Sequence, residues 1–220
     1  VSTIIGTIYA VGIPSIIMQS IGSIMTYCMN RILIEFSSTA TAVFGVYFKL
    51  QSFFFMPVFG LNNGITPIIA YNYGARQRKR MTKTIKLSLF VAFCLTFIGF
   101  VLFESIPQVL LGMFSASDDL LKIGIPALRT IGVHYLIAWY CIIAGTVFQA
   151  LGKAIFSMVV SIMRQLVVLI PAAYLLAKFG GLYMVWWSFP IAEIMSFIVS
   201  TAFFIRIWRT VIKDIPEGRE

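Results

Sequence analysis

Residues 57–86 read PVFGLNNGITPIIAYNYGARQRKRMTKTIK, and this stretch decides how the chain is organised. It joins an apolar run, interrupted by Gly60, Gly64 and Pro67, to a basic block that precedes the next apolar run. The block contains Arg76, Arg78, Lys79, Arg80, Lys83 and Lys86. Lysine and arginine concentrate in short loops that stay on the cytoplasmic side of a membrane. The stretch therefore predicts a hinge between two membrane spans, with its basic loop in the cytoplasm.

The overall composition is that of an integral membrane protein. Of the 220 residues, 60% are hydrophobic and only 11% are charged, and the mean hydropathy is +0.94. A soluble domain has about 25% charged residues. Spans of about 20 residues leave room for about six helices. The alternating segments of about ten residues that mark a transmembrane β-barrel do not occur. We therefore expect an all-α fold.

Several other classes of protein are disfavoured. A net charge of +9 in a soluble protein would indicate nucleic-acid binding, but here the basic residues gather at the ends of apolar runs, so we expect no nucleic-acid partner. Cys28, Cys94 and Cys141 lack the spacing of metal ligands. The motifs H-E-x-x-H, G-x-S-x-G and G-x-x-x-x-G-K-[ST] are absent from the sequence. We expect no enzyme activity, no metal site and no cofactor.

The apolar runs predict six membrane spans, at residues 4–29, 41–69, 85–103, 120–151, 154–177 and 182–208. Most basic residues then lie on the side of the central loop, including Lys153, Arg206, Arg209, Lys213 and Arg219. The opposite side holds Arg31, Lys122 and Lys178. This bias predicts that both ends of the segment are cytoplasmic. Ahead of the fourth span, Ser115 with Asp118 fits a helix capping box.

Polar side chains recur at helical spacing in four of the spans, which places them on stripes. A polar stripe in a membrane helix faces protein or water. The stripes include Gln19 in the first span, Gln51 and Ser52 in the second, Ser157, Ser161, Arg164 and Gln165 in the fifth, and Glu193, Ser196 and Ser200 in the sixth. We expect these four spans to line one wall of a cavity, with the third and fourth spans outside it or flanking it.

Four charged residues, Lys49, Arg129, Arg164 and Glu193, fall near the middle of predicted spans. Each would cost about 2.5–3.5 kcal/mol if it faced lipid. We therefore expect each to face protein or water, where such residues mark substrate or ion pathways. Alternatively, Glu193 simply neutralises Arg164 or Lys49 and locks helices together. His134, the only histidine, has the chemistry of a proton carrier, but we favour a hydrogen-bonded packing role.

Several motifs resemble the multidrug and toxic compound extrusion (MATE) transporters, most closely their bacterial DinF/MepA-like branch. They comprise Ile13-Pro14-Ser15, Asn30-Arg31, Lys49-Leu50-Gln51, Pro57, Gly60, Asn63-Gly64, Pro67 and Tyr71-Asn72-Tyr73-Gly74-Ala75, with Gln149-Ala150-Leu151-Gly152 and the segment 186–193 farther along. The resemblance places the first group in the seventh and eighth helices of that family, and the later ones at the ends of its tenth and twelfth helices.

The resemblance implies the C-terminal six-helix lobe of a twelve-helix exporter, with the N-terminal lobe missing from this chain. Such a protein expels lipophilic or cationic drugs and toxins across the plasma membrane by alternating access, in exchange for protons or sodium. Members of the family keep a coupling aspartate in the missing lobe. Some sodium-coupled members also have an acid in the seventh helix, where this chain offers only Gln19 and Gly22.

Glu193 is consequently the one mid-membrane acid of this lobe. The candidate pathway residues are Glu193, Arg164, Gln165, Lys49, Gln19 and Asn63. The residues expected to form the structural hinge and the cytoplasmic loop are Gly60, Gly64, Pro67, Tyr71, Asn72, Tyr73, Gly74 and Ala75. Because the chain begins with Val1 in place of methionine, we expect it to be a fragment.

Two other functions stay open. A flippase for lipid-linked saccharides would share the lobe but would present more cationic residues to the cavity, as Lys49, Arg129 and Arg164 allow. A non-transporting membrane scaffold would use the same charges only to hold its helices together.

Overall fold

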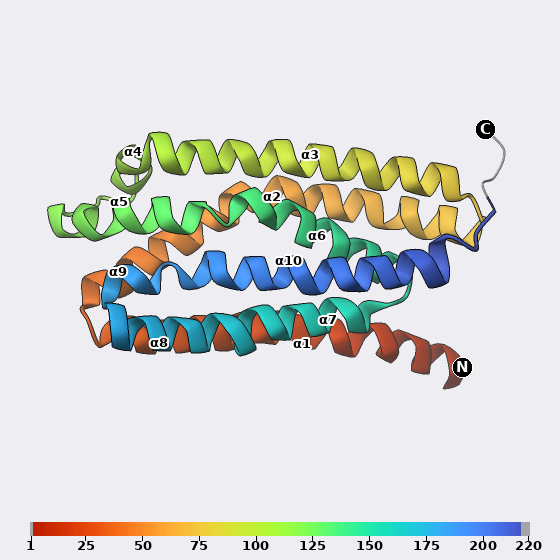
Figure 1. Cartoon of the computed structure of the whole chain (residues 1–220), viewed down its shortest axis with the longest axis horizontal. Coiled ribbons are helices and arrows are strands. Elements are labelled where there is room, and N and C mark those ends of the chain that lie inside the picture. Colours follow the sequence, from red (N-terminus) through yellow and green to blue (C-terminus); the bar gives the residue numbers. More distant parts are fainter. Residues whose placement is uncertain (1, 217–220) are drawn as a thin grey trace.

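The computed structural model describes residues 2–216, with the backbone alone for residues 2–4, 7 and 11; Val1 and Arg219 lie outside the described residues. The fold is all-helical, as predicted, and long helices run side by side along one axis (Figure 1). Among the described residues, five helices are long and apolar enough to cross a membrane, and a bent pair brings the number to six if it is one span. Each predicted span has a helical counterpart, in most cases longer than expected.

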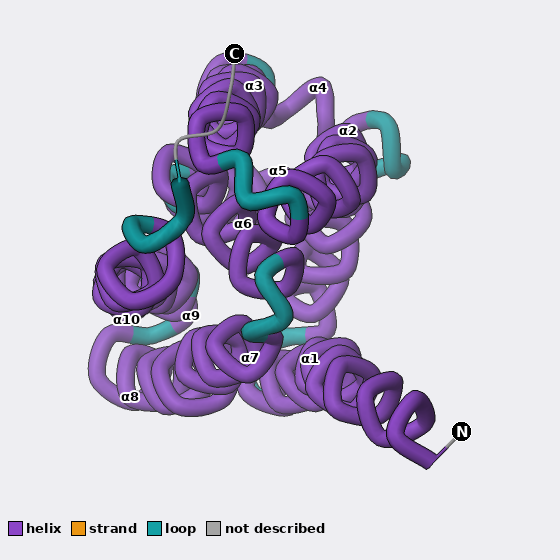
Figure 2. The backbone as a smooth tube through the Cα atoms, turned by 90° about the vertical axis from the view of Figure 1, so that its right-hand side faces the viewer, coloured by secondary structure: helices purple, strands orange, loops and turns teal. Residues whose placement is uncertain are grey.

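The N-terminal part consists of α1 (Ser2–Ile34), α2 (Ser38–Gly74), α3 (Arg78–Ser105) and the short α4 (Pro107–Gly112). Ser37 caps α2, because its side chain accepts a hydrogen bond from the Ala40 amide at 3.0 Å. The N-terminal end of α1 extends away from the other helices (Figure 2). Its apolar side chains there, such as Ile8, Ile13 and Ile16, are exposed.

The prediction that α2 breaks up at Gly60, Gly64 and Pro67 is wrong. The helix runs through Pro57 and Pro67 and ends at Gly74, and the chain then turns at Ala75–Gln77. Prolines are tolerated inside membrane helices because side chains and neighbouring helices satisfy the backbone groups that they release. Next to Pro67, the Thr66 hydroxyl donates to the Asn62 carbonyl at 2.7 Å. The turn itself lies at Arg76, whose φ is 52°.

The fourth span consists of α5 (Asp118–Gly132) and α6 (Tyr135–Ala150), which are bent by 52° at the break that contains His134. The capping box expected at Ser115 is wrong. Ser115 has a φ of 54°, and it is the Ser117 side chain that accepts from the Leu120 amide. The acids Asp118 and Asp119 then lie in the first turn of α5, as expected for the positive end of a helix.

The last two spans each combine several segments. The fifth comprises α7 (Ala154–Ile162), the π-helical segment η1 (Met163–Leu169) and α8 (Ile170–Gly180). The sixth comprises α9 (Leu182–Val185), α10 (Ser188–Ile207) and the π-helical segment η2 (Trp208–Ile212). A π-turn carries more residues than an α-turn, so each such segment changes the direction in which the side chains that follow it point.

The core surrounds α6, which lies near the middle of the bundle and contacts α2, α3, α7 and α10 (Figure 2). One apolar cluster includes Tyr47, Phe103 and Tyr135. A second, which includes Ile69, Met81 and Leu151, lies at the end that carries the basic loop (Figure 1). At that end the Arg78 amide donates to the Pro216 carbonyl at 3.2 Å and the Arg78 guanidinium donates to the Lys213 carbonyl at 2.8 Å. The start of α3 is thereby attached to the C-terminal segment.

Candidate functional site

A cavity of about 280 Å³, here called the central cavity, lies between α1, α2, α6, η1 and α10. Its lining is mainly apolar and aromatic, with a small number of polar groups. The lining residues are Gly22, Met25, Phe48, Gln51, Ser52, Phe55, Phe59, His134, Ala138, Ile142, Arg164, Gln165, Leu169, Phe189, Ala192 and Glu193. A small number of polar groups in an apolar pocket is the usual composition of a small-molecule binding site.

Glu193 and Arg164 form an ion pair at the wall of this cavity, with 3.4 Å between Arg164 Nη1 and Glu193 Oε2. The Glu193 side chain is 4% accessible, whereas the Arg164 side chain is 32% accessible. A buried carboxylate requires a partner, because burying an unpaired charge costs several kcal/mol. Glu193 therefore pairs with Arg164, as the alternative interpretation expected. The pair also lies beside a cavity.

The π-helical segment η1 positions Arg164 and Gln165, which are its second and third residues. Short π-segments occur frequently at functional sites, since they redirect side chains that a regular α-helix would point elsewhere. Opposite them, α10 buries Glu193, Ser196 and Ser200, which recur at helical spacing on one face. The ion pair thus joins the fifth span to the sixth across 29 residues of sequence.

His134 is buried, and its Nδ1 lies 2.6 Å from the Ile131 carbonyl oxygen. A carbonyl oxygen only accepts, so Nδ1 carries the proton in this contact. The ring also stacks against Phe55, with an interplanar angle of 8°. The expectation of a hydrogen-bonded packing histidine is confirmed. However, His134 also lines the central cavity beside Glu193, which the spacing of the sequence did not indicate.

A second cavity of about 200 Å³, here called the polar cavity, shares Phe59, Ile142 and Arg164 with the first. Hydroxyl and amide groups form much of its wall. Its lining residues are Met18, Phe59, Asn62, Cys141, Ile142, Gly145, Thr146, Gln149, Ser157, Val160, Ser161, Arg164 and Ser196. The Ser157 hydroxyl donates to the Gly145 carbonyl at 2.8 Å, which joins α7 to α6.

The structure brings together only some of the candidate residues. Glu193, Arg164 and Gln165 line the central cavity. Gln19, Asn63 and Lys49 are exposed and line neither cavity. The Lys49 amine lies 5.9 Å from the centre of the Phe114 ring, next to the loop before α5.

These side chains point away from the cavities because successive residues of a helix are rotated by about 100°. On α2, Asn62 points into the polar cavity, so its neighbour Asn63 points away. On α1, Met18 and Gly22 face the two cavities, and Gln19 is left outside. Arg129, also expected to face protein or water, is exposed in the last turn of α5.

The fourth span contributes more than predicted. Through His134, Ala138 and Ile142 it lines the central cavity, and through Cys141, Thr146 and Gln149 it lines the polar cavity. The expectation that this span lies outside or beside the cavity wall is wrong. Its sequence is apolar almost throughout, which is the pattern of a helix surrounded by other helices. A lipid-facing helix has the same pattern, so the polarity of the residues did not distinguish the two positions. None of the lining residues comes from α3, in agreement with its predicted peripheral position.

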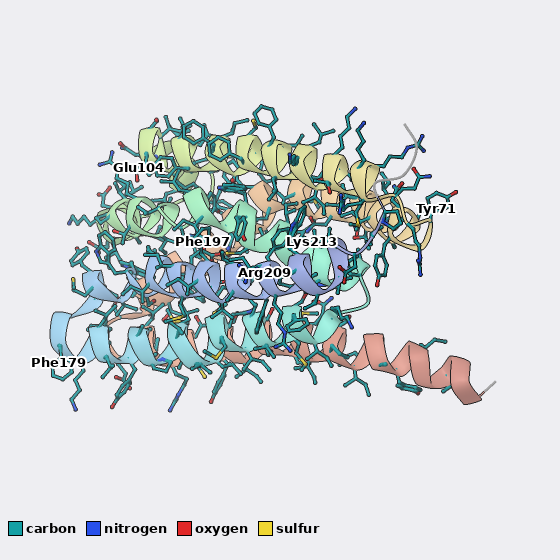
Figure 3. All side chains as sticks on the ribbon, turned by 45° about the vertical axis from the view of Figure 1, so that its right-hand side comes forward. Tyr71, Glu104, Phe179, Phe197, Arg209 and Lys213 are labelled. Carbon is teal, nitrogen blue, oxygen red and sulfur yellow. The ribbon has the colours of Figure 1, made fainter. Side chains whose placement is uncertain are left out.

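The motif Tyr71–Ala75, at the end of α2, lines neither cavity. Tyr71 is 75% exposed and lies at the end of the bundle that is opposite to Glu104 and Phe179 (Figure 3). Asn72 is buried and donates to the Ile68 carbonyl at 2.8 Å. The amides of Ala75 and Gln77 donate to the carbonyls of Tyr71 and Asn72, respectively. The motif therefore terminates the helix and forms the turn into the basic loop.

Removal of one partner from the ion pair is expected to cost more stability than removal of both. Arg164→Met leaves the buried Glu193 carboxylate without a counter-charge, and we expect it to destabilise the protein by about 3 kcal/mol, because Arg164 is partly accessible and the full range for buried pairs is about 3–5 kcal/mol. The double variant Arg164→Met/Glu193→Gln is expected to recover most of this loss. Thermal unfolding of the purified protein in detergent checks both, and equal losses for the single and double variants would contradict the expectation.

The fold and the site define the chain as a helical membrane protein that carries a buried ion pair beside a cavity. The MatE family model matches residues 14–175. The chain therefore belongs to the MatE family, whose members are multi-pass membrane transporters and not enzymes.

Two curated relatives are multidrug export proteins called MepA. That of Staphylococcus aureus (strain MSSA476) is 26% identical over 188 residues, and that of Staphylococcus haemolyticus (strain JCSC1435) is 29% identical over 197 residues. Each match covers 84% of this chain and 41% of the relative.

Two solved structures share the fold. The MATE multidrug transporter DinF-BH in complex with R6G is 32% identical, with a TM-score of 0.83, over 96% of this chain and 47% of the other. A MATE in complex with MaL6 is 23% identical, with a TM-score of 0.88, over 97% of this chain and 48% of the other. The chain thus spans about half the length of the relatives that it matches, which is consistent with one lobe of a longer transporter.

Proposed function

We propose that this chain is the C-terminal lobe of a secondary multidrug exporter. The exporter expels lipophilic or cationic compounds in exchange for protons or sodium by alternating access. The observation that supports this most directly is the Arg164–Glu193 ion pair at the wall of an apolar, aromatic cavity. Membership of the MatE family and the similarity to the MepA multidrug export proteins agree with it.

The chemistry of the central cavity fits a lipophilic cation. Phe48, Phe55, Phe59 and Phe189 line it, and aromatic faces attract cations as well as apolar groups. In the described part of the chain, Glu193 is the only acidic residue that lines either cavity. A cationic compound beside Glu193 would compete with Arg164 for the carboxylate. The cavity of about 280 Å³ is at the low end of ligand pockets, as expected for one wall of a larger site.

Alternating access requires a second body that moves against this lobe. The relatives are about twice as long as this chain, so an N-terminal lobe of similar size is the expected partner. Exposed apolar side chains on α1 offer a surface for contact with that lobe or with lipid. In this arrangement the central cavity faces the missing lobe.

The basic loop sets the proposed orientation. The loop between α2 and α3, the turn between α6 and α7 and the end of the sixth span lie toward one end of the bundle (Figure 1). These segments carry the basic block at 76–86, Lys153, Arg206, Arg209 and Lys213, and the positive-inside rule predicts a cytoplasmic position for that end. Both ends of this segment are then cytoplasmic, and the other end of the bundle faces the exterior of the plasma membrane.

Glu193 is the proposed coupling group of this lobe. Its carboxylate alternates between pairing with Arg164 and accepting a proton, and protonation releases the guanidinium. A buried carboxylate that can exchange one partner for another has two states. A proton and a cationic compound can each shift the equilibrium between these states.

A flippase for lipid-linked saccharides receives less support from the geometry. Of the three cations that favoured it, only Arg164 lines the cavities of the described chain, and Glu193 neutralises it. Lys49 and Arg129 are exposed on other faces. A lipid phosphate would therefore meet little net positive charge.

Transport by the purified full-length protein in liposomes tests the proposal. Tetraphenylphosphonium, a lipophilic cation, serves as the substrate, and a proton gradient or a sodium gradient is imposed separately. We expect one gradient to drive the cation across the membrane and the other to have no effect. Absence of movement under both gradients would contradict export. Transfer of a lipid-linked saccharide under the same conditions would favour the flippase.

A further inference from the structure

We infer that the polar cavity is a hydrated chamber that connects Glu193 with the basic-loop end of the bundle, and that protons use it while lipophilic compounds use the central cavity. This inference rests on the proposed export function. A second site, formed by Asn62, Gln149, Ser161 and Ser196, would then bind water and transfer protons.

Unpartnered buried groups indicate that the polar cavity holds water. Ser196 is 1% exposed, and within the described chain its hydroxyl has no hydrogen-bond partner other than the Cys141 thiol beside it. The buried Asn62 Oδ1 has no hydrogen-bond partner there. Both residues line the cavity. Buried polar atoms are nearly always satisfied by protein or by ordered water, and a polar space of about 200 Å³ accommodates several water molecules.

The polar cavity reaches the immediate surroundings of the carboxylate. Ser196 follows Glu193 by one helical turn on the buried face of α10. The Cys141 thiol, which also lines the polar cavity, lies beside both Glu193 and Ser196. Arg164, whose guanidinium contacts Glu193 Oε2, lines both cavities. Glu193 Oε1 is buried, and its neighbour in the polar cavity is the Cys141 thiol.

The other end of the polar cavity lies toward the basic loop. Gln149, an exposed lining residue, is in the last turn of α6, and Ser157 is in the first turns of α7. The turn between these two helices lies at the same end of the bundle as the turn between α2 and α3 (Figure 1). The hydroxyls and amides of the polar cavity therefore extend from Ser196 on α10 to Gln149, in the last turn of α6 at that end.

The two cavities differ in the compounds that they suit. Phe48, Phe55 and Phe189 line the central cavity but not the polar one. Serine, threonine and amide side chains are six of the 13 residues that line the polar cavity, where a lipophilic cation would displace water without replacing its hydrogen bonds. Separate routes that meet at the Arg164–Glu193 pair allow exchange without both species sharing one passage.

The titratable groups around Glu193 are consistent with a proton site. Arg164 faces it from η1, Tyr47 from α2, His134 from the α5–α6 break and Cys141 from α6. The α7 segment has no titratable side chain, and Tyr174 and Lys178 of α8 are exposed. Arg164 is therefore the charged group that contacts Glu193 among these neighbours.

Cysteine accessibility tests whether the chamber is hydrated. In the full-length protein, with its other cysteines replaced, Ser161→Cys and Gln149→Cys report on the polar cavity. Ile198→Cys, on the exposed face of α10 near the depth of Ser196, is the matched control. A membrane-impermeant methanethiosulfonate, added on the basic-loop side, is expected to modify both reporters at least about tenfold faster than the control. Reporter rates no faster than that of the control would overturn the inference.

A second variant separates the route from the export function. Ser161→Leu fills the polar cavity and is expected to slow proton-driven exchange at least about tenfold, while the dissociation constant for tetraphenylphosphonium stays unchanged. Unchanged exchange would overturn the proton route. A wild-type protein that neither binds nor moves tetraphenylphosphonium would refute the export function, and the labelling contrast would still decide whether the chamber is hydrated.

Discussion

Glu193→Gln is expected to reduce export of a lipophilic cation at least about tenfold and to abolish its dependence on pH. Glutamine keeps the size of the side chain but can neither hold a negative charge nor accept a proton at neutral pH. A hydrogen bond to a charged group contributes about 1.5–3 kcal/mol, and a loss of 1.4 kcal/mol corresponds to a tenfold change in affinity. Export of tetraphenylphosphonium from liposomes, measured at several internal pH values, checks this.

The same substitution at Glu104 provides the control for this experiment. Glu104 is at the end of α3 and lines neither cavity. Glu104→Gln is therefore expected to export like the wild type with the same pH profile. The charge that Glu193→Gln leaves behind, on Arg164, is partly accessible to solvent, so this variant is expected to remain folded. Wild-type export and pH dependence in Glu193→Gln would exclude Glu193 as the coupling group.

Phe103→Ala is expected to lower the stability of the bundle by about 3–5 kcal/mol, the usual cost of truncating a buried aromatic residue. The Phe103 side chain is 0% exposed. Its ring centroid lies 5.1 Å from that of Tyr135, 5.5 Å from that of Phe54 and 6.4 Å from that of Tyr47. These contacts join α3 to α2 and α6, and lipid does not fill the space that the ring leaves. The midpoint of thermal unfolding in detergent measures the effect.

Phe90 is the matched control for Phe103, because it belongs to the same helix and is 64% exposed. Phe90→Ala removes an equal number of atoms but leaves no internal cavity, so we expect a change of less than about 1 kcal/mol. A similar loss of stability in both variants would show that the aromatic cluster does not hold α3 in place.

The class of fold could be predicted because it depends on local properties of the sequence. A mean hydropathy of +0.94 and the spacing of charged residues indicate membrane helices, and the basic block at 76–86 separates the second span from the third. The family resemblance also rested on local motifs, such as Tyr71–Ala75, whose role as a helix terminus and turn is visible in backbone hydrogen bonds between near neighbours.

The candidate site could be predicted only in part. Glu193, Arg164 and Gln165 were identified because charge and polarity at mid-span are costly in lipid. Lys49 and Arg129 satisfied the same criterion but lie on exposed faces. Asn62 and its neighbour Asn63 are chemically identical in the sequence, and only Asn62 lines a cavity. Nothing in the sequence indicated that His134 lies near Glu193.

The sequence by itself determined the helical, membrane-embedded class of this protein, the approximate ranges of its spans and the basic loop between the second and third spans. Only the tertiary structure decided that Glu193 pairs with Arg164, that α6 lines both cavities and that Asn62 faces inward. Hydropathy and helical period are properties of neighbouring residues, so they can be read along the chain. The direction in which a side chain points relative to another helix depends on the 52° bend between α5 and α6, on the π-helical turn at η1 and on the packing of helices that are distant in sequence.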